Sequence, residues 1–154
     1  NTMISGIFMQ LQAINWWILI PLLFLFFLFG YLMYSSLFAA IGSTMGDDQG
    51  EGQSLTFLVI MPLLFGFYIS ISALKAPNSS LAVWSSLVPF FSPIVMPVRL
   101  AFEPPGWQIG LSLFILLLSS VFFAWLSARI YRVGILMYGK KATLGDLKKW
   151  FNAK

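Results

Sequence analysis

The sequence contains no cysteine and no histidine, and only 9% of its 154 residues are charged. Without cysteine there are no disulfide bonds, thiolate metal sites or cysteine nucleophiles. Without histidine the chain lacks the commonest metal ligand and the side chain that most readily titrates near neutral pH. Because a soluble domain usually has about 25% charged residues, this composition excludes an ordinary soluble enzyme, a nucleic-acid-binding protein and a disordered tail.

Apolar residues are what the sequence has in abundance: 59% are hydrophobic and 18% aromatic. A helix needs about 20 apolar residues to cross the ~30 Å hydrocarbon core of a bilayer. Three stretches meet this length, at about residues 16–41, 54–74 and 109–131. We therefore predict an all-α integral membrane protein with three transmembrane helices. Residues 3–14 are either the end of an earlier span or an interfacial stretch.

A proline-rich segment separates the last two spans. The uncharged window 76–98 contains four prolines, at positions 77, 89, 93 and 97. Each proline removes a backbone donor, which is costly in lipid unless the backbone is buried in protein or lines water. We predict that residues 82–102 form one or two short helices that enter the membrane edge and return, the alternative being an apolar loop on the outer surface. Arg99 then lies near the outer interface or pairs with Glu103, four residues on.

The basic residues give the orientation. Seven of the nine Lys and Arg residues follow position 128, and such residues favour the cytoplasmic side of a membrane. The tail, residues 132–154, is therefore predicted to be cytoplasmic and attracted to membrane lipids. Within it, Thr143 and Asp146 fit a capping box that starts a short amphipathic helix. The same orientation places the loop of residues 42–53 in the cytoplasm and residues 82–102 outside.

Carboxylates gather at one place, Asp47, Asp48 and Glu51. Their spacing resembles half of the magnesium–diphosphate site of intramembrane prenyltransferases, which needs two such clusters. The other interpretation is a solvated turn that stabilises the start of the next helix. The chain also lacks a phosphate-binding glycine-rich loop with its lysine. We expect no catalytic, cofactor-binding or metal-binding residues.

Small residues recur at four-residue spacing on each span, which allows close packing of helices in a membrane or arises by chance. The positions are Ser36 and Ala40, Gly66 and Ser70, and Ser120, Ala124 and Ala128.

Three segments carry a resemblance to a known family. They are residues 31–42 (YLMYSSLFAAIG), 88–99 (VPFFSPIVMPVR) and 131–140 (YRVGILMYGK), with the acidic turn after the first of them. Together they resemble the C-terminal half of ABC type-2 transporter permeases, in the branch that includes sodium-efflux permeases. The sequence begins with Asn1 and has no secretory signal pattern, so we expect it to be a piece of a longer polypeptide.

The resemblance implies a six-span permease of the plasma membrane (the bacterial inner membrane), with both termini cytoplasmic and the fourth to sixth spans in this chain. Such permeases work in pairs as exporters, alternate between inward-open and outward-open states, and dock on separate ATP-binding subunits. The coupling helix of the family lies between the second and third spans, outside this chain.

The expected roles of individual residues follow from these topological and family arguments. None is catalytic, and simple folding or anchoring is the alternative role for each. An intramembrane magnesium-dependent transferase and a structural membrane subunit are the alternative functions. The candidate residues are Pro89, Ser92, Pro93, Pro97 and Arg99 at an outer gate; Asp47, Asp48, Glu51 and Gln53 near the ATP-binding subunit; and Tyr131, Arg132, Tyr138 and Lys140 as cytoplasmic anchors.

Overall fold

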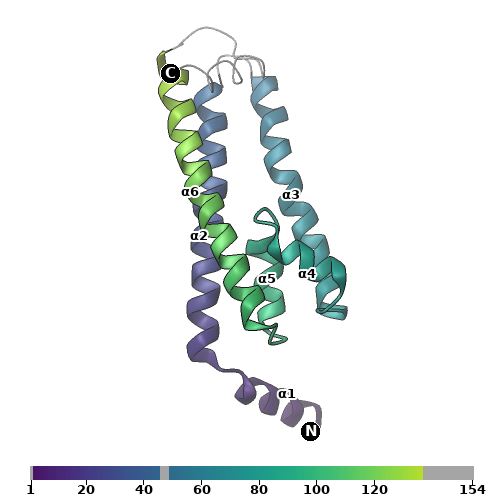
Figure 1. Cartoon of the computed structure of the whole chain (residues 1–154). Coiled ribbons are helices and arrows are strands. Elements are labelled where there is room, and N and C mark those ends of the chain that lie inside the picture. Colours follow the sequence, from purple (N-terminus) through teal and green to yellow (C-terminus); the bar gives the residue numbers. More distant parts are fainter. Residues whose placement is uncertain (1, 46–48, 137–154) are drawn as a thin grey trace.

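The computed structural model describes residues 2–45 and 49–136, and every regular element in these ranges is an α-helix. Three long helices stand side by side, two short ones lie between them at one end, and a further short helix precedes the bundle (Figure 1). In chain order the helices are α1 (Thr2–Ala13), α2 (Trp16–Thr44), α3 (Gln49–Lys75), α4 (Ser80–Leu87), α5 (Ser92–Leu100) and α6 (Gly106–Leu136).

The long helices α2, α3 and α6 correspond to the three predicted spans. Their apolar parts are Trp16–Thr44, Gly52–Lys75 and Gly106–Val133, each long enough to cross a membrane. Pro21 lies inside α2 and Pro62 inside α3, as is common in membrane helices, where neighbouring groups satisfy the freed carbonyls. The prediction of an all-α membrane architecture with three such helices is confirmed.

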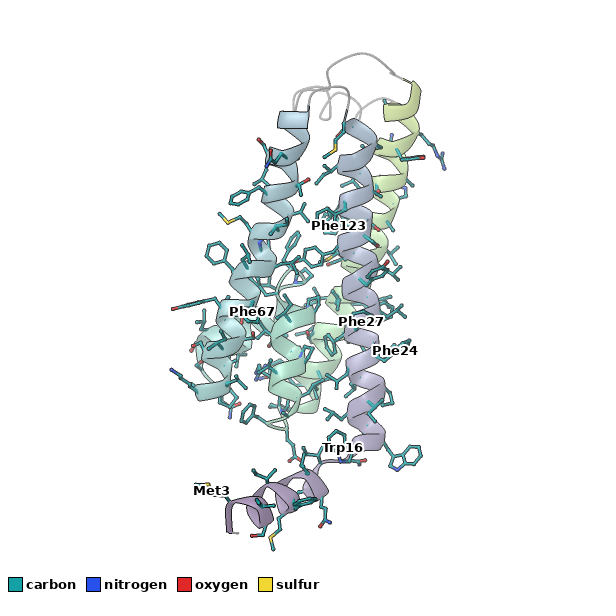
Figure 2. The ribbon with its side chains drawn as sticks, turned by 180° about the vertical axis from the view of Figure 1, so that it is seen from behind. Met3, Trp16, Phe24, Phe27, Phe67 and Phe123 are labelled. Carbon is teal, nitrogen blue, oxygen red and sulfur yellow. The ribbon has the colours of Figure 1, made fainter. Side chains whose placement is uncertain are left out.

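Large apolar side chains cover the outside of the bundle. Phe24 and Phe27 of α2 are 61% and 68% exposed, and Phe67 of α3 is 62% exposed; all three point away from the bundle (Figure 2). In water an apolar surface of this extent would cause association. In a bilayer the same side chains contact lipid tails, so this surface fits a membrane-embedded bundle.

Helix α5 is the centre of the packing. It contacts α2, α3, α4 and α6, whereas α3 and α6 do not pack against each other within the described residues (Figure 1). Helices α2 and α6 pack along each other. The buried apolar core comes from these three helices: Phe26, Met33 and Tyr34 of α2, Met96 and Leu100 of α5, and Leu116 of α6.

The proline-rich segment is helical, as predicted, and not an apolar loop. Ser79 caps α4 by accepting a hydrogen bond from the backbone N–H of Ala82, at 3.3 Å. Pro89 lies two residues after the end of α4 and disfavours its continuation. Pro93 lies in the first turn of α5, where a missing N–H costs nothing. The chain therefore forms two short helices that return to the same end of the bundle (Figure 1).

The predicted cytoplasmic amphipathic helix, which starts at Thr143, lies outside the described residues.

Candidate functional site

A buried arginine lies at the centre of the proline-rich segment. The Arg99 side chain on α5 is 0% exposed and its guanidinium donates three hydrogen bonds to three different parts of the chain. Nε donates to the carbonyl oxygen of Pro77 at 2.9 Å, Nη1 to Oγ of Ser86 at 2.7 Å, and Nη2 to Oε1 of Gln108 at 2.7 Å. Arg99 therefore ties the turn before α4, α4 itself and the first turn of α6 to α5.

All three acceptors of Arg99 are neutral oxygens. Burying an arginine is costly unless its N–H groups are satisfied, and the planar guanidinium meets this by directing several donors at fixed angles. Glu103, which the sequence offered as an ion-pair partner, is exposed and has a positive φ of 49° just beyond α5. The structure thus replaces the predicted pair with Glu103 by a buried guanidinium on neutral acceptors.

Two further serines extend this arrangement. Ser112 of α6 donates to the carbonyl oxygen of Ser86 at 2.6 Å, and its Oγ lies 2.7 Å from Oγ of Ser92 at the start of α5. We call Arg99, Ser86, Ser92, Gln108 and Ser112 the Arg99 cluster. Each of them is at most 8% exposed, and the part of the chain that the structure describes has no buried side-chain nitrogen or oxygen without a hydrogen bond.

The α4–α5 segment is also fitted closely against α2. A Cβ added at Gly30 of α2 would lie 2.5 Å from Cβ and 2.8 Å from Cγ of Pro93. Tyr34, one turn further on, donates from its hydroxyl to the carbonyl oxygen of Phe90 at 2.6 Å. Only glycine allows the backbone of α2 to approach Pro93 so closely, so this pair fixes where α5 sits.

The structure places the five residues of the predicted outer gate in one segment, but they do not share one environment. Ser92 and Arg99 belong to the Arg99 cluster, and Pro93 contacts Gly30. Pro89 is half-buried in the turn after α4, and Pro97 is half-buried inside α5.

Several partners of these residues were not predicted from the sequence. Ser86, Gln108 and Ser112 were not among the candidate residues. Gln108 and Ser112 are four residues apart on α6, so they share a helical face. A pair of polar residues on one face at the start of an apolar span is the signal by which they could have been found.

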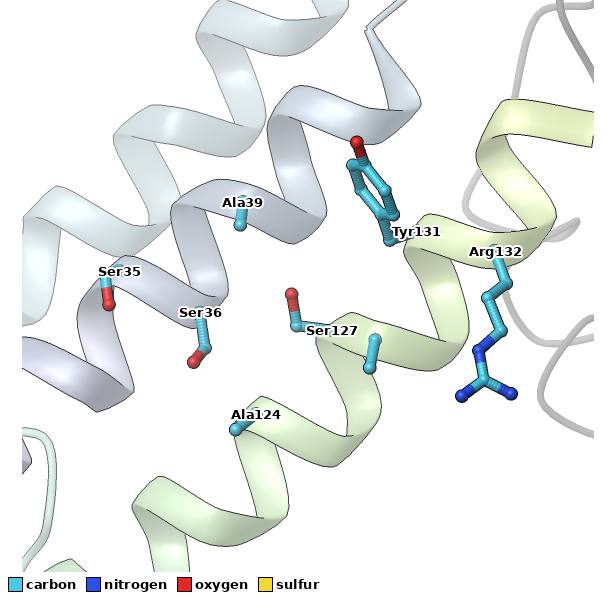
Figure 3. A pocket seen from close by; sticks show the side chains of 8 residues that line it. Ser35, Ser36, Ala39, Ala124, Ser127, Tyr131 and Arg132 are labelled. Atoms are coloured by element: carbon cyan, nitrogen blue, oxygen red, sulfur yellow. The ribbon is translucent and has the colours of Figure 1, made fainter.

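At the opposite end of the bundle, Tyr131 and Arg132 are exposed near the end of α6. With α2 they line an open groove of about 520 Å³ (Figure 3). The small residues Ala124 and Ala128, noted for their spacing, also line this groove, whereas Ser120 is buried and donates to the carbonyl oxygen of Phe29 in α2 at 2.8 Å. The remaining lining residues are Ser35, Ser36, Ala39 and Ser127.

The predicted contacts with an ATP-binding subunit are only partly described. Gln53 is exposed in the first turns of α3, and Glu51 belongs to the backbone of the same helix. Asp47 and Asp48 lie outside the described residues, as do the predicted anchors Tyr138 and Lys140. Among the described residues no group of three or more His, Cys, Asp or Glu side chains is placed to hold a metal ion.

Chemically, the Arg99 cluster is a set of paired donors and acceptors. Each guanidinium nitrogen has a neutral partner, and the serine hydroxyls bond to one another or to backbone carbonyls. Such an arrangement holds helices in fixed positions in a medium of low dielectric constant.

Comparison with known proteins finds one family and two relatives. Residues 2–129 match the family model described as "ABC-2 family transporter protein". The chain is 33% identical over 126 residues to "Uncharacterized protein YhaP" of Bacillus subtilis (strain 168), which covers 81% of this chain and 30% of that protein. It is 30% identical over 124 residues to "Uncharacterized protein MJ1024" of Methanocaldococcus jannaschii, covering 78% of this chain and 30% of that protein. The chain thus spans about a third of the length of these relatives, and no solved structure matches it.

Proposed function

This chain belongs to the ABC-2 family of transporter proteins, and we propose that it forms the C-terminal half of a permease that exports its substrate by alternating access. It is a multi-pass membrane component of an ABC transporter, a class that works with an ATP-binding protein. The finer proposal is that a separate subunit binds and hydrolyses ATP, and that two permease protomers enclose the pathway. The resemblance of residues 88–99 and 131–140 to the family supports it.

We place the chain in the plasma membrane with its C-terminus in the cytoplasm. The support is the concentration of Lys and Arg after position 128, since such residues stay on the cytoplasmic side. Tyr131 and Arg132 then anchor α6 at the inner interface. In this orientation α4 and α5 lie at the outer end, and the α2–α3 loop with Asp47 and Asp48 faces the ATP-binding subunit.

The observation that carries the proposal is the Arg99 cluster. It joins α4, α5 and the start of α6 into one unit, and Gly30 fits that unit onto α2. We infer that this unit closes the outer end of each protomer as a rigid body. Opening to the outside then comes from separation of the two permease protomers when the ATP-binding subunits close.

Two measurements on the full-length protein test this function. The first is co-purification from membranes with an ABC ATP-binding subunit, which we expect to be retained in a stable complex. The second is labelling of single cysteines with a membrane-impermeant maleimide. A cysteine that replaces Asn78, in the turn between α3 and α4, should react in intact cells. A cysteine that replaces Gln53 should react only after the membrane is opened.

Two results contradict the proposal. A full-length protein that never associates with an ATP-binding subunit would favour a structural membrane subunit. Reaction of Gln53 but not Asn78 in intact cells would reverse the orientation and place α4 and α5 at the inner surface, where they could not be an outer gate.

The transferase alternative makes a different prediction. Replacing Asp47, Asp48 and Glu51 together by Asn, Asn and Gln would abolish a magnesium-dependent transfer reaction, because the carboxylates would hold the metal. A permease should keep its complex and its transport with these replacements, within a few-fold of wild type. Loss of all activity with an intact complex would favour the transferase.

A further inference from the structure

We propose that α1 is an interfacial helix that lies on the surface of the lipid bilayer, at the end of the bundle where α2 and α6 begin. In the orientation proposed above this is the outer surface. Its apolar face contacts the bilayer at the boundary between lipid headgroups and acyl chains. The proposal does not depend on the transport function, because it concerns only how the chain meets the membrane.

The residue pattern of α1 gives it two different faces. At 100° per residue, five of its six large apolar residues fall within one stripe, which occupies less than half of the helix circumference; the sixth, Met9, lies on the opposite face and is 74% exposed. Gly6 and Gln12 lie on the opposite face. The apolar stripe consists of Met3, Ile4, Ile7, Phe8 and Leu11.

The apolar stripe has no protein partner in the described residues. Its side chains are between 42% and 85% exposed, and α1 packs against none of the helices α2 to α6. An exposed apolar stripe on a helix that precedes a transmembrane segment and turns away from its axis fits a helix that lies in the membrane interface.

Tryptophans mark the membrane surface at this end of the bundle. Trp16 and Trp17 begin α2, with Trp17 91% exposed, and Trp107 near the start of α6 is 64% exposed. Tryptophan concentrates where lipid headgroups meet the hydrocarbon core. Because α1 ends just before Trp16, its last turn is at the depth of this aromatic belt.

A hydrogen bond fixes the corner between the two helices. The indole Nε1 of Trp16 donates to the carbonyl oxygen of Leu11 at 3.0 Å. The helical structure is interrupted at residues 14 and 15, and α1 turns away from the axis of α2 (Figures 1 and 2). The bond holds the end of α1 beside the tryptophan belt instead of letting it continue α2 into water.

The absence of charge from α1 identifies the type of lipid interaction. Its sequence, TMISGIFMQLQA, has no Lys, Arg, Asp or Glu. Attraction to anionic headgroups therefore contributes nothing, and burial of the apolar stripe is the driving force. We expect α1 to bind equally to zwitterionic and anionic membranes, with no dependence on salt.

Single-cysteine fluorescence on the full-length protein in phosphatidylcholine vesicles tests this inference, since the chain has no cysteine of its own. Cysteines at Ile7 and Leu11 report the apolar stripe, and cysteines at Gly6 and Gln12 report the opposite face. A Cβ at Gly6 meets nothing within 4 Å, so Gly6→Cys disturbs no packing. Leu117 in the middle of α6, 38% exposed, serves as the control for a deep position. In each single-cysteine variant, the cysteine carries an environment-sensitive nitrobenzoxadiazole label.

We expect the fluorescence emission of the labels at Ile7 and Leu11 to be blue-shifted and protected from quenching by iodide. Lipids with a nitroxide near the headgroup should quench these labels at least twofold more than lipids with a nitroxide near the chain end. The Leu117 label should show the reverse depth order, and the labels at Gly6 and Gln12 should be quenched by iodide. Adding anionic lipid should leave these values unchanged.

Three outcomes overturn the inference. If the label at Ile7 lies deeper in the bilayer than the label at Leu11, and is quenched more by the nitroxide near the chain end than by the one near the headgroup, as at Leu117, α1 is part of a membrane span. Iodide quenching at all four α1 positions would place it in water. Protection from iodide at Ile7 and Leu11 without quenching by either lipid nitroxide would show that protein covers the apolar stripe.

Discussion

At the scale of single residues, Arg99 is the position on which most of the α4–α5 end of the bundle depends. Its three acceptors come from the turn before α4, from α4 and from α6. A hydrogen bond to a charged group contributes about 1.5–3 kcal/mol in proteins, although bonds inside membranes average less. Removing the guanidinium also leaves buried acceptors without partners. The resulting loss of stability is therefore larger than the loss on removing an arginine from the surface.

We predict that Arg99→Lys lowers the free energy of unfolding by about 1–3 kcal/mol, because an ammonium group cannot direct donors to all three acceptors. The measurement is unfolding of the full-length protein in mild detergent. Arg132→Lys makes the same chemical change at an exposed position and should shift stability by less than about 0.5 kcal/mol. Equal effects of the two substitutions would show that the Arg99 hydrogen bonds do not stabilise the fold.

Two glycines of α2 provide a matched pair. Gly30→Ala places a methyl group against Pro93 and should destabilise the protein by about 1–3 kcal/mol through overpacking. Gly42→Ala puts its Cβ in open space on the same helix and should stabilise it by up to about 1 kcal/mol, since alanine favours helix more than glycine does. Thermal unfolding of both variants measures the difference. A Gly30→Ala protein as stable as Gly42→Ala would contradict the close approach of α2 and α5.

At the scale of helices, α4 and α5 form one unit with the start of α6. Ser92 and Ser112, whose Oγ atoms lie 2.7 Å apart, are both 0% exposed and join α5 to α6. If the unit moves as a rigid body, fixing these two helices to each other should not interfere with transport.

The cysteine pair Ser92→Cys and Ser112→Cys tests this rigidity, because the substituted sulfurs come within reach of a disulfide bond. After oxidation we expect ATP-driven transport within about twofold of the reduced protein. Each single-cysteine variant, treated with the same oxidant, is the control for oxidation without a cross-link. Loss of transport on oxidation of the pair, with recovery on reduction, would show that α5 moves against α6 during the cycle.

The three long helices could be predicted from the sequence because their apolar composition identifies them. A charge-free apolar run of about 20 residues specifies a membrane helix whatever its partners are. The four prolines likewise indicated that the segment between the last two spans breaks into short pieces. Arg99 was a candidate because a lone basic residue in an apolar segment is conspicuous. Ser92 was a candidate because it lies in the segment 88–99 that resembles the family.

The partners of Arg99 could not be predicted in the same way. Sequence reasoning looks for an opposite charge nearby, and Glu103 was the available one. The actual acceptors, the Pro77 carbonyl, Ser86 and Gln108, are neutral and come from segments that only the folded bundle brings together. The contact of Gly30 with Pro93 depends on the same tertiary arrangement, because neither residue marks the other in the sequence.

At the scale of the whole molecule, the bundle has two chemically different ends. One end carries the α4–α5 unit, the Arg99 cluster and Trp16, Trp17 and Trp107. The other carries Arg129, Arg132 and the groove between α2 and α6. The orientation proposed above makes the first of these the outer end and the second the end that faces the ATP-binding subunit.

The central claim, that this chain is part of a permease driven by an ABC ATP-binding subunit, is tested most directly by ATP hydrolysis in reconstituted vesicles. The hydrolysis rate of the ATP-binding subunit is measured with and without the full-length permease, across sodium, lipids, peptides and amphipathic drugs. We predict that the permease changes the rate at least twofold and that one of these substrates raises it further. A rate that is the same with and without the permease, in a membrane that contains both proteins, would contradict the claim.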